Sequence, residues 1–193
     1  GFAPGNFSAS IGAGIGRTAE DHDGRLPVSG GVGVFVERGG ADTYGADNGA
    51  MGFGYRGASG FFFDADGDDV YAATSLAFGA GVDLSLGRFV DLAGGDRSTG
   101  GDLAIESALG FGEDLGTGLF VDAEGSDAYE VGLFCQGIGS INGFGLFVDE
   151  AGDDTYDSEA NQVWGSAVLT LVGREPDSNP RRALGTFGLF LDT

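Results

Sequence analysis

The chain has 193 residues and a mass of 19.5 kDa, which fits a single domain. Glycine supplies 40 residues and proline only 4, which excludes collagen, and a 41% hydrophobic content is enough to form a core. The net charge of −21 and the absence of lysine argue against nucleic acid and anionic membranes as partners. No apolar run reaches the roughly 18 residues of a membrane span, and the single cysteine, Cys135, excludes an internal disulfide.

A repeat with phenylalanine in one register organises the whole chain. Each copy has a glycine, a phenylalanine two residues later and an acid at the fifth position. The copies are Gly33–Glu37, Gly60–Asp64, Gly87–Asp91, Gly118–Asp122, Gly145–Asp149 and Gly188–Asp192. They follow one another at steps of 27, 27, 31, 27 and 43 residues, so we identify an internal repeat of about 27 residues.

Each repeat predicts the same elements in the same order. A β segment around the phenylalanine leads into an acidic turn, and a second acid follows five residues after the first. A second β segment passes through a tyrosine in four repeats (Tyr44, Tyr71, Tyr129 and Tyr156), and a glycine-rich third segment follows it. So much glycine leaves no long apolar period of 3.6 residues, so helices are not expected.

The fold predicted from these repeats is all-β, a parallel β-helix or β-solenoid. Units of about 27 residues cannot bury a face alone and must stack, with three short strands to a coil. We expect six to seven coils in one domain over residues 1–193. A β-sandwich is the competing fold, but sandwiches do not require identical turns at equal spacing.

Two stretches interrupt the repeat and are expected to be loops extruded from the coil. One covers residues 17–32 and carries the only histidine, His22, while the other covers residues 167–186 and carries Arg174, Arg181 and Arg182. Insertions in repeat proteins can contact partners, and they can equally be solvated loops without a special role.

Stacking turns equivalent positions into columns of neighbouring residues. The phenylalanines at 35, 62, 89, 120, 147 and 190 should form one ladder of rings. The residues on either side of each phenylalanine point the other way and are apolar too, with Arg88 as the polar exception. Both faces of this strand are therefore apolar, and we expect an inserted loop, a terminus or another molecule to cover the outer one.

The acids form columns that repel one another and have few basic residues nearby. Neighbouring charges about 4.8 Å apart repel by about 1 kcal/mol even in water. Hard oxygen ligands repeated in glycine-containing turns are what calcium binds. The alternative is that aspartate and glycine are simply good turn formers on a solvated edge. The candidate calcium ligands are Glu37, Asp42, Asp64, Asp66, Asp69, Asp91, Asp96, Asp122, Asp127, Asp149 and Asp154.

The turns Gly40–Tyr44, Gly67–Tyr71 and Gly152–Tyr156 resemble the calcium-binding turns of secreted bacterial repeats-in-toxin proteins. In that family turn aspartates hold calcium between the coils of a parallel β-roll. The resemblance covers about a quarter of the chain and departs from the family in its period, which is 27 residues rather than 18. It implies calcium binding at the turn acids and an extracellular or cell-surface location.

No catalytic residues are predicted, because the chain lacks lysine and its paired carboxylates recur in every coil, which argues for a structural role. We expect a structural protein, as a subunit of a filament, surface layer or adhesin stalk. The alternative is a calcium-dependent carbohydrate-binding or polysaccharide lyase module, which would make carbohydrate a partner.

Head-to-tail self-association is the expected partner interaction. Within the repeats the first acid precedes the next Gly-x-Gly by 15 residues, as from Asp64 to Gly79. Counting 15 residues from Asp192 into a second copy leads to Gly14, so one copy continues the repeat of another in phase.

Overall fold

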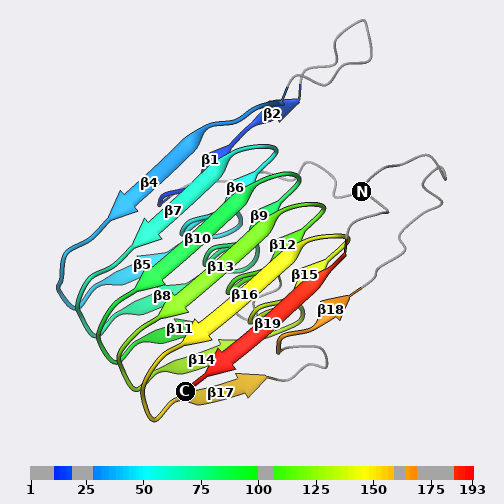
Figure 1. Ribbon diagram of the computed structural model, residues 1–193. Helices are drawn as coiled ribbons and strands as arrows, with labels where there is room; N and C mark the ends of the chain where they lie inside the picture. The colour runs from blue at the N-terminus through cyan, green and yellow to red at the C-terminus, as the bar shows by residue number, and fades with distance from the viewer. Residues whose placement is uncertain (1–10, 19–27, 100–106, 159–163, 169–184) are drawn as a thin grey trace, which may run out of the picture.

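Three short strands per repeat form the structure, and equivalent strands of successive repeats pair in parallel sheets (Figure 1). The structure is a computed structural model that describes residues 11–18, 28–99, 107–158, 164–168 and 185–193. Within these ranges no residue is helical, and no helix suited to crossing a membrane occurs there. The predicted β-solenoid is confirmed, and the β-sandwich is wrong because its strands would be antiparallel.

The phenylalanine sheet contains the first strand of each repeat. Its strands, in spatial order, are β4 (Val32–Val36), β7 (Ser59–Phe63), β10 (Leu86–Asp91), β13 (Thr117–Asp122), β16 (Phe144–Asp149) and β19 (Phe187–Asp192). The register is the one that the repeat predicts, because Phe62 lies beside Phe89 and Phe89 beside Phe120. Each side chain in this sheet therefore has its equivalent from the next repeat as a neighbour.

Two further sheets complete each coil. The tyrosine sheet consists of β5 (Thr43–Gly45), β8 (Val70–Ala72), β11 (Arg97–Thr99), β14 (Ala128–Val131) and β17 (Thr155–Ser158). The glycine sheet consists of β1 (Gly14–Ile15), β6 (Gly54–Tyr55), β9 (Gly81–Val82), β12 (Gly112–Glu113), β15 (Gly139–Ser140) and β18 (Ala167–Val168). Figure 1 shows the phenylalanine sheet in front and the other two behind it.

Five coils are complete, and single strands of two partial coils, β1 and β19, lie at the two ends of the stack. The bases of the first expected loop pair with each other, because β2 (Arg17–Thr18) and β3 (Val28–Ser29) form an antiparallel ribbon. Most of both expected loops, with His22 and the three arginines of the second loop, lies outside the described residues.

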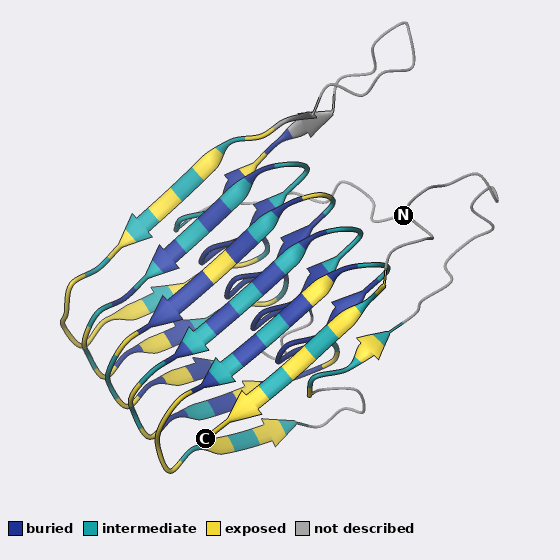
Figure 2. Ribbon diagram, in the orientation of Figure 1, coloured by how far each residue is buried: buried dark blue, intermediate teal, exposed yellow. Residues whose placement is uncertain are grey.

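The predicted ladder of phenylalanines forms the centre of the core. Neighbouring rings from Phe35 to Phe190 are nearly parallel, with centroids 4.7 to 5.0 Å apart. Tyrosine rings meet this ladder edge-on, as at Phe120 and Tyr129, whose planes are 83° apart. The four central phenylalanines, from Phe62 to Phe147, are buried, and Figure 2 shows buried and half-exposed positions alternating along their strands.

Glycine is required where the chain enters the glycine sheet. Gly52, Gly79, Gly110 and Gly137 form one column with φ between 76° and 81°, a conformation that residues with a Cβ atom rarely adopt. A Cβ atom on Gly110 would also collide with the carbonyl oxygen of Leu146 in β16. The high glycine content thus lets backbones approach without side chains between them.

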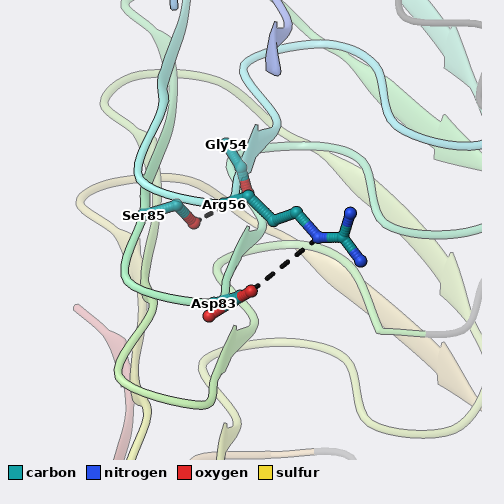
Figure 3. A network of polar contacts seen from close by, with 4 residues as sticks. All are labelled: Gly54, Arg56, Asp83 and Ser85. Carbon is teal, nitrogen blue, oxygen red and sulfur yellow. Dashed lines mark hydrogen bonds and ion pairs between the residues drawn. The ribbon is translucent and has the colours of Figure 1, made fainter. Parts of the chain in front are cut away.

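Polar contacts join successive coils at the corner after the glycine sheet (Figure 3). Ser85 Oγ donates a hydrogen bond of 2.8 Å to the carbonyl oxygen of Gly54, and Arg56 Nε lies 3.9 Å from Asp83 Oδ2. The Arg56 guanidinium also lies over the ring of Tyr55. The Ser85–Gly54 and Arg56–Asp83 contacts join successive coils, so they hold the coils in the same register as the ladder.

We predict that Phe120→Ala costs about 3–5 kcal/mol of unfolding free energy, because it opens a cavity in the middle of a buried ladder. Leu119→Ala, one residue away on the outer face, is the control and should cost much less. Chemical denaturation of both variants measures the difference. Equal losses would mean that the ladder contributes no more than the outer face.

Candidate metal centre

The acids lie at the corner between the phenylalanine and tyrosine sheets. The acids that follow the phenylalanine, here the first acids, include Asp91, Asp122 and Asp149, which end strands β10, β13 and β16. The second acids each precede a tyrosine-sheet strand, as Asp96 precedes β11. Because parallel strands end at the same edge of a sheet, both columns converge on one corner.

Most of these acids point into the molecule rather than into solvent. Seven of them are no more than 4% exposed: Asp64, Asp69, Asp91, Asp96, Asp122, Asp127 and Asp149. The described residues contain two ion pairs, Arg56–Asp83 and Arg97–Glu130, and neither reaches these columns. The acids are therefore buried without a basic partner. The alternative that they are turn formers on a solvated edge does not fit this corner.

Three groups of carboxylates are close enough to share a cation. They are Asp64 with Asp69 and Asp91, Asp91 with Asp96 and Asp122, and Asp127 with Asp149 and Asp154. In each group one carboxylate oxygen per residue lies within 4.8 Å of the others. Two oxygens that bind one calcium ion at about 2.4 Å can be separated by at most about 4.8 Å, so the spacing fits.

Eight of the eleven candidate ligands are brought together in these groups, and three are not. Asp42 and Asp66 are exposed, and Glu37 is half-buried and accepts a hydrogen bond from the Gly39 N–H. All three belong to the first two acidic turns of the chain, at the end of the stack where fewer coils cover them.

Backbone N–H groups orient the second acids in a ladder of their own. Asp69 Oδ1 accepts the N–H of Asp42 at 2.5 Å, and Asp96 Oδ1 accepts that of Asp69 at 2.7 Å. Asp127 and Asp154 continue the series at 2.6 and 2.9 Å. Four of the five second acids, all except Asp42, thus receive one hydrogen bond from the preceding coil, which fixes the direction of the carboxylate.

Tyrosine hydroxyls donate to the acids from the other side. Tyr129 donates to Asp122 Oδ2 at 2.8 Å, and Tyr156 donates to Asp149 Oδ2 at 2.9 Å. Tyr71 lies within 3.2 Å of Asp64 and Asp69 and 2.5 Å from Asp91 Oδ2. The sequence could have shown this role, because a tyrosine two residues after the second acid shares its face of the strand.

Four buried acids have one oxygen held by a protein donor and the other oxygen without a donor. The unpartnered atoms among the described residues include Asp96 Oδ2, Asp122 Oδ1, Asp127 Oδ2 and Asp149 Oδ1. A buried oxygen without a hydrogen bond costs about 1–3 kcal/mol, and more when it is charged. These oxygens need either a proton or a cation.

Burial raises the pKa of these carboxyls, and the neighbouring acids raise it further. Burial raises the pKa of Asp122 to about 9, with a further rise from Asp127, although the Tyr129 hydroxyl opposes it. The pKa of Asp96 rises to about 8 and that of Asp64 to about 7, again chiefly through burial. Without a cation, the corner therefore holds protons at neutral pH.

The chain was compared with family models, curated proteins and solved structures, and no significant match was found in any of the three comparisons. What the chain shares with repeats-in-toxin proteins is therefore limited to two features, the stacked parallel coils and the clustered acidic residues. Family membership does not follow from it.

Without metal, the protein should lose stability as the pH rises from about 5 to 9. An unfolded aspartate has a pKa of about 3.9, so above that pH the unfolded state releases protons that folded Asp96 and Asp122 keep up to pH about 8 and 9. Thermal melts in the presence of a chelator measure this slope, and a shift of 1 kcal/mol corresponds to about 2–4 °C.

Asp122→Asn should flatten that slope and raise the melting temperature at pH 8 in chelator, because it replaces a buried acid with a neutral side chain. Asp157→Asn changes the net charge equally at an exposed position and serves as the control. If both substitutions act alike, overall charge rather than burial determines the pH dependence.

Proposed function

We propose that this protein is a structural β-solenoid whose buried acid columns bind divalent cations, with calcium as the ion. The observation that carries the proposal is the set of buried carboxylates that have a fixed direction, a free oxygen and no basic partner. A bound cation would neutralise the repulsion between neighbouring acids and complete the coordination of the free oxygens.

The donor atoms favour calcium over other ions. The three groups offer only oxygen, which suits hard cations such as calcium and magnesium rather than zinc or copper. Magnesium gives up its water shell reluctantly, whereas calcium accepts six to eight oxygens and bidentate carboxylates. Buried groups with several carboxylates in contact therefore suit the larger ion.

A structural role in an extracellular setting is part of the proposal. The same acid pair recurs in coil after coil, as a stabilising device does and a single active site does not. Calcium sites of extracellular modules work with Kd on the order of 10⁻⁴–10⁻³ M, which fits sites made of a few carboxylates.

Calcium should raise the melting temperature, because a ligand that binds only the folded state adds RT ln(1 + [L]/Kd) to its stability. At 100 times Kd this amounts to about 2.7 kcal/mol, or about 5–11 °C. The double variant Asp64→Asn with Asp69→Asn removes two ligands of one group and should reduce the calorimetric stoichiometry and the thermal shift.

Glu124→Gln with Asp153→Asn makes the same change of charge at exposed positions and is the matched control. Magnesium at equal concentration tests the choice of ion. The proposal fails if calcium binds neither calorimetrically nor by thermal shift at neutral pH, or if the control variant loses as much binding as the ligand variant.

The proposal includes end-to-end association, supported by the matching patterns of strands β4 and β19. Gly33 and Phe35 occupy the positions that Gly188 and Phe190 occupy in β19, so β19 can pair with β4 of a second copy in the register of the rest of the sheet. The ladder would then continue from Phe190 to Phe35.

Val34→Pro should abolish this association. The N–H of Glu37 bonds to Phe63 in β7, so alternate residues such as Val34 direct their N–H toward the free edge. Proline removes that donor, whereas the control Val34→Ala keeps it. Electron microscopy should show filaments for the control only, and filaments formed by both variants would contradict pairing through this edge.

A further inference from the structure

The outer face of the phenylalanine sheet is almost entirely apolar. Three outward positions on each of six strands make 18, and 15 of them are apolar, the exceptions being Ser59, Arg88 and Thr117. The middle row across the sheet, for example, reads Val34, Phe61, Arg88, Leu119, Leu146 and Leu189. On the end strands these side chains are well exposed, from 39% at Leu189 to 71% at Val32.

The outer face of the tyrosine sheet in the same coils is mixed, with polar and charged side chains beside apolar ones such as Val70. Its outward positions include Thr43, Arg97, Glu130, Thr155 and Asp157, and Arg97 and Glu130 form an ion pair there. The fold therefore does not require an apolar exterior. Among the outward positions of the phenylalanine sheet, one residue is charged, Arg88, and none of the acidic residues that the structure describes occupies such a position. Contiguous apolar patches of this kind mark interaction surfaces.

We propose that this outer face binds the same face of a second copy of the chain, as two packed sheets. Apolar sheet faces are ordinarily buried against another sheet about 10 Å away. On a face without acids, two chains of net charge −21 can also meet without bringing carboxylates together.

The sizes of the side chains fix the arrangement of the two copies. One end strand, β4, offers only valines, while the opposite end strand, β19, offers Phe187, Leu189 and Leu191. A two-fold axis parallel to the strands places β4 of one copy opposite β19 of the other, so small side chains face large ones. At the first outward position of each strand, this axis places Ser59 opposite Phe144 and Val32 opposite Phe187. A two-fold axis along the stack would instead place valines on valines.

The area of the outer face limits the size of the proposed interface. Six strands about 4.8 Å apart and five residues long at about 3.3 Å each give a footprint of roughly 400 Å² per copy. The accessible area of the side chains is larger than this flat footprint, which places the interface at the small end of specific ones. Association should therefore be weak and should depend on protein concentration.

Sedimentation equilibrium of the full chain tests the proposal, with calcium and with chelator. In the Val34→Pro background, which removes end-to-end association, we expect a monomer–dimer equilibrium that Leu119→Gln with Leu146→Gln weakens at least tenfold. The matched control is Val70→Gln with Ala72→Gln, on the outer face of the tyrosine sheet, which should leave the dimer unchanged. Circular dichroism checks that both variants fold.

Spin labels test the geometry. Cys135 is fully buried, so labels attach to cysteines introduced by Arg88→Cys or Val34→Cys. With the axis parallel to the strands, the two labels at position 88 lie near the centre and close together. The two labels at position 34 lie at opposite ends of the stack, about 24 Å apart across the sheet, whereas those at position 88 are about 4.8 Å apart in that direction. Short distances at both positions would overturn the proposed axis.

Two results would overturn the proposal itself. One is a monomer at all concentrations up to the millimolar range, which would mean that a second copy does not cover the face. The other is a dimer that the glutamine pair on the phenylalanine sheet does not weaken. Sedimentation of the monomer with phosphatidylcholine vesicles, lost in the same variant, would identify a lipid surface as the occupant instead. Because an end-to-end polymer grows beyond two copies, the mass distribution separates the two kinds of association.

Discussion

Parallel pairing in a single register is the constraint on which the rest of the structure depends. It places every residue beside its own equivalent from the next repeat, at the distance between hydrogen-bonded strands. For phenylalanine this is favourable, because parallel rings stack at about the strand spacing and fill the core evenly. For glycine it is neutral. For aspartate it is unfavourable, since like charges lie next to one another in a column. Other groups must therefore offset this repulsion.

In the structure, the two oxygens of a buried carboxylate have different surroundings. One oxygen accepts a hydrogen bond from a backbone N–H of the preceding coil or from a tyrosine hydroxyl. On four buried acids the other oxygen has no donor. Protein donors thus orient the acids but do not neutralise them. Only a proton or a cation can complete the site, and these two have opposite dependence on pH.

The sequence was sufficient to predict the coil, the ladder and the acid columns, because an ungapped repeat defines which residues become neighbours. It was not sufficient to predict which acids face inward. Asp64 is buried while Asp66, two residues later, is exposed, and that difference depends on the path of the turn rather than on the pattern of residues. The sequence also could not predict the left-handed backbone conformation of four residues, since these residue types do not favour positive φ. They are Met51, Phe78, Leu109 and Gln136.

The third coil departs from the repeat in the tyrosine column. Ser98 stands in the tyrosine column there, so Asp91 and Asp96, which form a group with Asp122 of the next coil, have no tyrosine of their own coil. Tyr71 reaches it from one neighbouring coil and Tyr129 from the other, each donating to a first acid. Asp96 Oδ2 and Asp122 Oδ1 remain without a donor, and burial raises the pKa of these two carboxyls to about 8 and about 9, higher than those of Asp64 and Asp127. The two acids with the highest of these pKa values therefore lie in one group at the middle of the stack, and a cation would have to displace protons there up to a higher pH than at Asp64 or Asp127.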